Sequence, residues 1–393
     1  MGYVKKPEPR TAWAGTCIAA LVAAALQPAI EARAQSDPFG AFYAPPPGAP
    51  AQPGAAAPST RTGVTSVTGA VGRGYAGTDE GGFASLAQIA LLPRTAAPMA
   101  VDLKAQNPKV ARARPRIVVP TYALALVRAG KVSAYAAGAG SELAQRRTTL
   151  TTALVGVPDA LAESLAEEAW QDLVTRLSAA GFDVVTPEQM LAAPEMARLP
   201  VVGTRAEGVN GLSVYGPRSA PLRAGHPYNS AVLAGSRAAI ALTDLSIELD
   251  ALVLTPQLAV DYQQLETTGQ RMYVGSAQVG ARVWFSMLAG SGANFLVGTS
   301  RKGLGSGPWG GFTLAQNRGT PERFGVMYEV DDRSDSAAVH NAFARAGLGS
   351  LYRQSQVYAV EVDPNRYAAL VRAAFQGLNA AIVAELKAAR GLA

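Results

Sequence analysis

The chain has 393 residues, enough for one large domain or two smaller ones, and its formal net charge of +6 is mild over that length. Such a charge demands neither nucleic acid nor an anionic membrane surface, and we expect no nucleic-acid partner. The only cysteine is Cys17, near the N-terminus, and there are two histidines. This composition argues against thiol chemistry, disulfides and cysteine–metal sites, so we expect no metal and no cofactor.

Residues 1–34 have the pattern of a secretory signal peptide. Basic residues near the start precede the apolar run Trp13–Ile30, and Ala32-Arg33-Ala34 matches the small-x-small rule for cleavage. An uncleaved membrane anchor is the alternative, but the run is short for a membrane span and contains Gln27 and Pro28. We therefore expect an exported bacterial protein that is periplasmic, outer-membrane-associated or secreted.

Residues 35–110 lack the long periodic elements of a folded domain. The part from Ala44 to Pro58 is rich in proline, alanine and glycine, and such a composition buries too little apolar surface to fold. It is typical of a semi-extended spacer. We expect residues 35–110 to be a disordered linker or tail, and residues 111–393 to form a single α/β domain.

The expected domain begins with an apolar stretch at Arg116–Val127, which is typical of a strand. Pro120 within it indicates a bulge or an edge position, because proline donates no hydrogen bond to a neighbouring strand. Gly130-Lys131 and residues 136–141 are interpreted as loops. The strand at Thr149–Val157 follows them, since it is rich in β-branched residues.

The helix after this strand is the clearest prediction in the chain. Val157–Gly181 begins with proline and an acidic residue and ends at a glycine suited to a left-handed cap. Phe182–Val185 predicts a short strand, and Thr186 is a good cap for the next helix. A strand, a crossover helix and a strand usually form one parallel unit within a sheet. One helical stripe is apolar: Leu161, Leu165, Ala169, Trp170, Leu173, Val174 and Leu177.

The second half of the chain continues this alternation of strands and helices. Ser236–Leu249 predicts a helix and Ala251–Leu254 a buried strand, which Pro256 should interrupt. Leu258–Met287 alternates apolar and polar residues on both sides of a turn, and this pattern predicts a long antiparallel hairpin. The glycine-rich stretch Gly290–Gly311 is interpreted as a mobile loop.

Two more strands and a closing helix complete the expected fold. Arg323–Val330 and Gln356–Val362 are strand candidates, and Asp363-Pro364 predicts the start of an amphipathic helix. Together the elements predict an α/β fold, with α+β as the alternative. A mixed sheet would carry packed helices and the long antiparallel hairpin.

Few residues suggest chemistry. His226 and His340 are the only histidines, and each is interpreted as a surface or hydrogen-bonding residue rather than a catalytic one. The chain has neither a His-Glu-x-x-His motif nor a Gly-x-Ser-x-Gly elbow. Gly303–Gly311 lacks the Gly-Lys-Ser/Thr ending of a phosphate-binding loop. We therefore assign no catalytic, cofactor-binding or metal-binding residue.

Two surface features remain as weaker candidates. Glu329, Asp331 and Asp332 have the right chemistry for a cation, but a solvated turn explains them as well. Trp284 and Trp309 have the chemistry to line a glycan or peptide surface, although aromatic residues in strands and turns more often pack.

One order of elements matches a known pattern. A helix leads into a short strand and a second helix at Ala180–Leu191, a later helix leads into the apolar strand Leu249–Leu254, and the hairpin Leu258–Met287 follows. Across residues 112–300 this order resembles the periplasmic α/β domain of the curli-secretion outer-membrane lipoprotein family. The resemblance implies an α/β domain at a secretion channel. This chain has no cysteine placed for lipidation and has Thr255-Pro256 where the family tends to have glycine, so it carries over no functional residue.

These features favour a non-catalytic exported protein that binds or scaffolds an envelope protein or polymer. One alternative is a hydrolase of envelope polymers that works with paired carboxylates, since that chemistry needs no histidine. Another is a subunit of an oligomeric secretion pore, which fits membrane association and a homo-oligomer. In that pore Asp261, Gln263 and Gln278 would face a lumen and Val279–Met287 would face lipid.

We predict that the leader is cleaved between Ala34 and Gln35. The small residues at positions 32 and 34 follow an apolar core of signal-peptide length, which is the arrangement that signal peptidase recognises. N-terminal sequencing of protein recovered from periplasm or medium should begin at Gln35. A mature protein that still begins near Met1 would show that the leader is an anchor.

Overall fold

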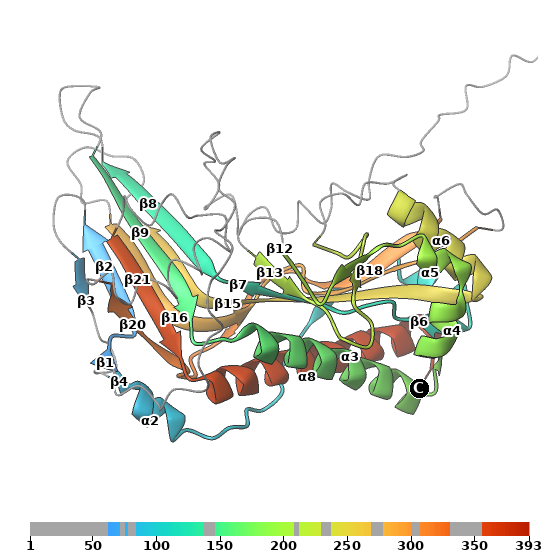
Figure 1. Cartoon of the computed structure of the whole chain (residues 1–393), viewed down its shortest axis with the longest axis horizontal. Coiled ribbons are helices and arrows are strands. Elements are labelled where there is room, and N and C mark those ends of the chain that lie inside the picture. Colours follow the sequence, from blue (N-terminus) through green and yellow to red (C-terminus); the bar gives the residue numbers. More distant parts are fainter. Residues whose placement is uncertain are drawn as a thin grey trace, which may run out of the picture.

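The structure is a computed structural model that describes residues 62–70, 75–77, 84–136, 146–207, 212–228, 237–268, 278–299, 307–330 and 356–392. Within these residues the chain forms a mixed α/β fold with two large sheets and a few helices (Figure 1). The expected signal peptide lies outside the described residues, as does the proline-rich part of the expected spacer. The predicted mixed sheet with packed helices is confirmed.

The larger sheet is organised around one long strand, β15 (Ala251–Thr268). Along one edge β15 pairs in parallel with β6 (Arg116–Val118) and β7 (Ala123–Val127). Along the other edge it pairs antiparallel with β17 (Gly292–Leu296) and β16 (Gln278–Met287). The remaining strands of this sheet are β2 (Ser66–Ala70), β3 (Tyr75–Gly77), β5 (Leu103–Gln106), β10 (Asp183–Val184), β12 (Arg205–Glu207), β13 (Leu212–Tyr215), β18 (Trp309–Leu314) and β19 (Arg318–Thr320).

The smaller sheet has the strand order β20-β21-β9-β8. It packs against the hairpin β15–β16, where the Thr152 hydroxyl lies 3.0 Å from the Tyr262 hydroxyl. Two short pairs complete the strands of the described chain: β1 (Thr62–Gly63) with β4 (Ala84–Ser85), and β11 (Val201–Gly203) with β14 (Leu222–Arg223). The four strands of the smaller sheet are β20 (Gly325–Glu329), β21 (Gln356–Val362), β9 (Arg146–Val155) and β8 (Ala129–Ala136).

Two long helices cover one face of the larger sheet and lie side by side in Figure 1. They are α3 (Asp159–Ala179) and α8 (Pro364–Arg390), which the Glu168–Arg372 ion pair joins at 2.6 Å. Four shorter helices are α2 (Leu86–Ala90), α4 (Pro187–Ala192), α5 (Pro194–Ala197) and α6 (Arg237–Glu248), and a 3-10 helix, η1, spans Pro108–Arg112.

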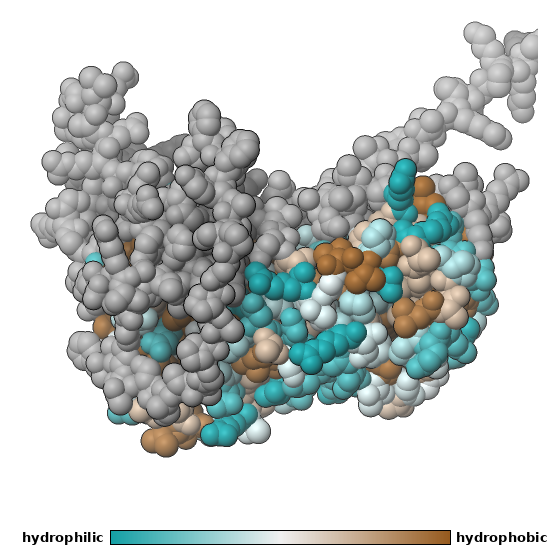
Figure 2. All heavy atoms as spheres, in the orientation of Figure 1, coloured by the Kyte–Doolittle hydropathy of each residue, from teal (hydrophilic) through white to brown (hydrophobic). Residues whose placement is uncertain are grey.

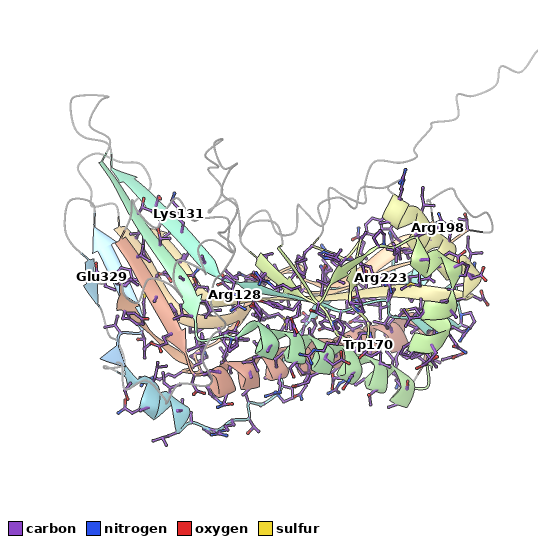
Figure 3. All side chains as sticks on the ribbon, viewed as in Figure 1. Arg128, Lys131, Trp170, Arg198, Arg223 and Glu329 are labelled. Atoms are coloured by element: carbon purple, nitrogen blue, oxygen red, sulfur yellow. The ribbon has the colours of Figure 1, made fainter. Side chains whose placement is uncertain are left out.

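The predicted helix starts and apolar stripes are confirmed. Asp363 caps α8 by accepting a hydrogen bond from the Arg366 backbone N–H at 2.8 Å, and Thr186 caps α4 in a capping box. In α3 the inward stripe is buried, and the Trp170 indole donates to the Val119 carbonyl at 3.3 Å (Figure 3). The outer surface on this side mixes hydrophilic and hydrophobic residues (Figure 2). The helices are therefore amphipathic supports of the sheet.

The prediction that the strands before and after α3 share one sheet is wrong. β9 belongs to the smaller sheet, where it pairs in parallel with β21. β10 belongs to the larger sheet, where it pairs in parallel with β6. The order of strand, helix and strand in the sequence does not determine which strand each of them pairs with. Here β21, from the end of the chain, supplies the partner for β9, so α3 links two sheets.

The prediction that Pro256 interrupts the strand is also wrong, because β15 runs through it from Ala251 to Thr268. On the edge that faces β6 and β7, pairing with β6 ends at Val253 and pairing with β7 begins at Gln257. Pro256 lies at this gap between two partner strands. A residue without an N–H group costs the ladder little there.

Two segments interpreted as loops are strands. Gly130-Lys131 belongs to β8, whose partner β9 is in register from Ala129 to Ala136. Part of the glycine-rich stretch forms the strands β17 and β18, which pair with each other. Glycine suits this pairing because a Cβ on Gly310 would come within 2.4 Å of the Phe295 ring. Close packing of backbones, rather than mobility, explains this glycine.

The folded part of the chain begins before the expected boundary at residue 111. β2 pairs with β16 and β5 pairs with β18, so both belong to the larger sheet. Arg366 of α8 also donates to the carbonyls of Pro93 and Thr95. These short segments lack periodicity of their own because their partners come from distant parts of the chain.

Replacing Trp170 by Ala should lower the free energy of unfolding by about 3–5 kcal/mol, because a buried indole and its hydrogen bond are lost and a cavity remains. The matched control on the same helix is Glu168→Gln, which weakens a partly exposed pair and should cost about 1 kcal/mol or less. Urea unfolding of both variants and the parent gives the comparison. Equal small losses would contradict the packing of α3 on the sheet.

Candidate functional site

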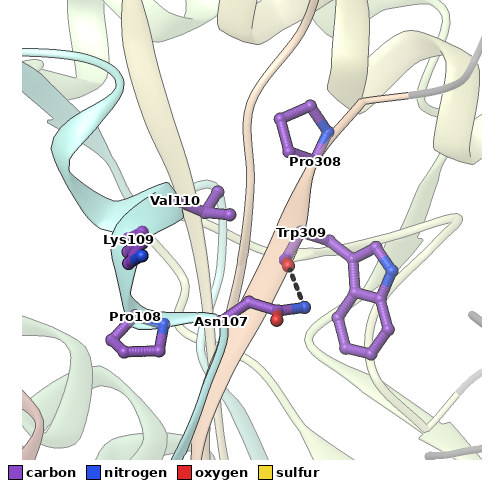
Figure 4. Close-up of a pocket in the computed structure, with 6 residues that line it drawn as sticks. All are labelled: Asn107, Pro108, Lys109, Val110, Pro308 and Trp309. Carbon is purple, nitrogen blue, oxygen red and sulfur yellow. Dashed lines mark hydrogen bonds between the residues drawn. The ribbon is translucent and has the colours of Figure 1, made fainter.

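The candidate site is a surface hollow of about 600 Å³ beside Trp309. It is lined by η1 and the residue before it on one side, and by the start of β18 on the other (Figure 4). A volume of this size is within the range of small-molecule and saccharide sites. The lining residues are Asn107, Pro108, Lys109, Val110, Pro308 and Trp309.

Local backbone geometry holds the two walls of the hollow together. Asn107 has a left-handed conformation with φ of 48°, which asparagine tolerates better than most residues. Its side-chain nitrogen donates to the Trp309 carbonyl at 3.1 Å. Directly before it, β5 pairs with β18, with Gln106 opposite Gly311. The Trp309 backbone is therefore fixed by a strand on one side and by an amide on the other.

Most side chains that line the hollow are apolar, and Asn107 and Lys109 are the polar ones. Pro108, Lys109 and Pro308 are exposed, whereas the Trp309 side chain is half-buried. A half-buried indole keeps an apolar face available while its position is set by packing. In Figure 4 the indole lies on the opposite side of β18 from Lys109 and Val110.

The basic residues between positions 104 and 116 fall into two groups, those with an ion-pair partner and those without one. Arg114 and Arg116 form ion pairs with Asp250 and Asp183, respectively. Lys104, Lys109 and Arg112 are exposed, and within the described ranges none of them is paired with a carboxylate. We call Lys104, Lys109 and Arg112 the basic rim. Of these three cations only Lys109 lines the hollow, and no acidic residue lines it.

The end of α8 anchors the segment that carries the basic rim. The Arg390 guanidinium donates to the carbonyls of Ala111, Arg114 and Pro115 at 2.9, 2.9 and 2.7 Å. Arg112 in turn donates to the Ala389 carbonyl. Cations at the C-terminus of a helix also interact favourably with its dipole. The rim is therefore presented from rigid elements.

The structure separates the two tryptophans proposed to line one surface. Trp309 lies in the hollow, whereas Trp284 lies on β16 under the Arg282 guanidinium, 5.8 Å from ring centre to cation. A Cβ on Gly319 would meet the Trp284 indole, so this ring is packed against the next strand. Trp284 is a packing residue, and only Trp309 stays a candidate for binding.

The two histidines are not brought together. His340 lies outside the described residues. His226 is buried in the loop after β14, with its backbone N–H donating to the Arg223 carbonyl at 3.0 Å. Its Nδ1 has no hydrogen-bond partner among the described atoms, and burial lowers the pKa of His226 to about 4. A histidine held neutral in this way is a packing residue at neutral pH.

The structure does not show the three acidic candidates for a cation site close together. Glu329 is exposed at the end of β20, and Asp331 and Asp332 lie outside the described residues. Within the described ranges, no group of three or more His, Cys, Asp or Glu side chains is placed to hold a metal ion. The strand pairing of Gly310 and Gly311 also places the end of the glycine-rich stretch inside the sheet.

A buried charge cluster at the junction of the two sheets was not predicted from the sequence. Arg128, which joins β7 to β8, donates to the Tyr215 hydroxyl at 2.6 Å and to Asp159 at 3.3 Å (Figure 3). The Tyr215 hydroxyl also donates to Asp159 at 2.7 Å, and Arg205 forms an ion pair with Asp159 at 3.0 Å. Arg128 and Arg205 both pair with the single carboxylate of Asp159. The cluster fastens α3 to both sheets and carries no free reactive group.

One helix in the described part of the chain, α8, is long and apolar enough to cross a membrane. Two thirds of its apolar window is buried in the protein, as expected for a core helix. Comparison with protein-family models, with curated proteins and with solved structures finds no match. The hollow beside Trp309 is therefore assessed on its own geometry.

Lowering the pH should destabilise the fold through His226. Its pKa is about 4 in the folded chain and 6.5 in the reference state, so the unfolded chain takes up the proton first as the pH falls below 6.5. The loss should reach about 2–3 kcal/mol at pH 4.5 relative to neutral pH.

The control is His226→Gln, which removes the titrating group. Urea unfolding at pH 7.5, 5.5 and 4.5 should show a smaller pH dependence for this variant than for the parent. The same pH dependence in both proteins would show that His226 is not buried in the neutral form.

Proposed function

We propose that this chain is a non-catalytic exported protein that serves as a binding or scaffold component of the bacterial cell envelope. The observation that carries the proposal is the hollow beside Trp309 with its basic rim. Its lining includes the Trp309 residue and one exposed cation, Lys109, on segments whose backbones are held by hydrogen bonds. These are the features of a recognition surface, in which aromatic anchors contribute most of the affinity and charge steers the partner.

The secretory leader pattern at residues 1–34 and the linker expected at residues 35–110 support an envelope location. A spacer lets a folded part reach a partner some distance from its anchorage. The partner would be an envelope protein or polymer that meets the hollow from solvent. The protein would hold this partner in place, since the hollow offers contacts and orientation.

The test is photo-crosslinking in cells, with a photoreactive amino acid in place of Pro108, which leaves Lys109 intact. Adducts with an envelope component should form at this position, because Pro108 is exposed and lines the hollow. The matched control is the same replacement at Arg94, an exposed cation after α2. Adducts that form equally at both positions, or at neither, would contradict binding at the hollow.

A second candidate function is a subunit of an oligomeric secretion pore, and the two hairpins favour it. Besides β15–β16, the strands β8 and β9 form a second antiparallel hairpin that packs against it. Asp261 and Gln263 are buried between the hairpins, and the Gln263 amide nitrogen has no partner there. A buried unpaired amide costs about 1–3 kcal/mol, a cost that vanishes if the hairpins separate and the amide meets water.

Dye release from vesicles tests the pore. The double variant Gly130→Cys and Gln263→Cys, in a Cys17→Ser background, should lock the hairpins together, because Gly130 faces the Gln263 side chain. Release should occur with the reduced protein and stop on oxidation. Absence of release under reducing conditions would contradict pore formation and leave the binding proposal unaffected.

A further inference from the structure

We infer that the N-terminal arm exchanges between two copies of this chain, so that the arm of one copy docks on the body of the other. The arm is the set of described residues from Thr62 to Gln106, and the body is the described chain after Asn107. A reciprocal exchange gives a closed twofold dimer that keeps the contacts of the monomer. The exchange is independent of binding at the hollow, and three properties support it: the exposure of the arm, its backbone contacts and the turn that joins it to the body.

The arm lies on the surface of the body. Figure 1 shows the chain leaving α2 and running along α8 before it enters β5. No residue from Leu91 to Asp102 is buried. Between Ser85 and Gln106 the buried residues are Leu86, Ile89 and Leu103, which lie in α2 and β5. A segment with so few buried side chains can detach while the sheet behind it stays folded.

The body recognises the extended part of the arm through backbone groups. The buried Arg366 guanidinium of α8 donates to two carbonyls of the arm at 2.6 and 3.2 Å. Further along α8 the Met99 N–H donates to the Ala373 carbonyl at 2.9 Å. Gly377 makes room for the arm, because a Cβ there would come within 1.9 Å of the Met99 carbonyl oxygen. The same arm from a second copy satisfies all of these contacts.

The larger sheet receives the strands of the arm in the same way. β5 pairs with β18, and β2 pairs with β16. Among the described strands β18 is the one partner of β5, so β5 is an edge strand. When the arm detaches, β18 presents an unpaired edge, which is a template for a strand from another chain. The strand that fits this edge in register is β5 of a second copy.

The turn between the arm and the body is strained. Asn107 has a left-handed conformation, with φ of 48° and ψ of 49°. Pro108 follows it, and a residue before proline prefers an extended backbone. Opening the turn to an extended conformation removes this strain, although it breaks the hydrogen bond from the Asn107 amide to the Trp309 carbonyl. Short hinges under strain favour the exchange of an element between copies.

Disulfide trapping between two single-cysteine variants tests the exchange. Lys104 lies opposite Thr313 where β5 pairs with β18, so cysteines at these two positions are close enough to form a disulfide. The full chain with Cys17→Ser carries either Lys104→Cys or Thr313→Cys, and the two variants are refolded together from urea and oxidised. A disulfide between positions 104 and 313 requires the arm of one copy to pair with β18 of the other. Mass spectrometry of the dimer fraction should detect this linked peptide.

The matched control is a strand pair within the body. Ser133 and Thr149 lie opposite each other in the hairpin β8–β9. Refolding Ser133→Cys together with Thr149→Cys should give no disulfide between positions 133 and 149, because each body keeps its own hairpin. Equal yields at the two pairs would overturn the exchange of the arm, since they would show general mixing of strands.

Two variants of the turn should shift the monomer–dimer equilibrium in opposite directions. Asn107→Val should raise the dimerisation constant about tenfold or more, because a β-branched residue is strained in the left-handed conformation. Pro108→Ala should lower it, because residue 107 then follows no pre-proline restriction. Gel filtration with light scattering over a range of protein concentrations gives both constants. The disulfide trap decides the case if Asn107→Val fails to fold, because the trap leaves the turn unchanged.

Three results would overturn the exchange. The first is a parent chain that stays monomeric up to about 1 mM, which is the effective concentration that a short linker gives the arm within one chain. The second is a dimer without the disulfide between positions 104 and 313, which would place the interface elsewhere. The third is a shift in the same direction for Asn107→Val and Pro108→Ala.

Discussion

Backbone pairing along β15 is the constraint on which the rest of the structure depends. An interior strand must satisfy its N–H and C=O groups on both edges, and β15 needs partners over the 18 residues from Ala251 to Thr268. On one edge β6 and β7 pair with Ala251–Val253 and Gln257–Val260, and on the other β17 and β16 pair along most of the strand. These partners come from distant parts of the chain, so their order in the sheet sets the topology.

The second constraint is the passage of the chain from the larger sheet to the smaller one. Between β7 and β8 the chain leaves the larger sheet, and the two terminal nitrogens of the buried Arg128 guanidinium donate to the Val157 carbonyl, Asp159 and Tyr215 at this point. A buried charge is tolerated only when it is paired and hydrogen-bonded. The cluster therefore specifies how α3 meets both sheets, in addition to the apolar packing of its stripe.

The hollow beside Trp309 is a consequence of the same sheet. β18 is held by β17 and β5, so its first residue stands at the rim of a rigid layer. At the C-terminus of α8, Arg390 donates to the carbonyls of Ala111 and Arg114. These hydrogen bonds hold the end of η1 and the residues after it in place. The hairpins β8–β9 and β15–β16, in contrast, bury polar groups against each other, and Thr152 is hydrogen-bonded to Tyr262 and Gln263 between them.

Sequence patterns alone determined the elements whose evidence is local. The starts of α4 and α8 follow from a cap residue and a proline, and the apolar stripe of α3 follows from its helical period. The antiparallel hairpin likewise follows from alternation in adjacent segments. Trp309 was recognisable as a candidate by its chemistry, but nothing near it in the sequence indicated Asn107 or Lys109 as neighbours.

Only the tertiary structure decided which strands share a sheet and where the hollow lies. The two strands flanking α3 belong to different sheets, Pro256 is tolerated inside β15, and the short segments before residue 111 are strands because distant partners complete them. The physical reason is the same in each case. Hydrogen bonds between strands join residues far apart in the chain, and periodicity within one segment does not identify the partner on the other side of the bond.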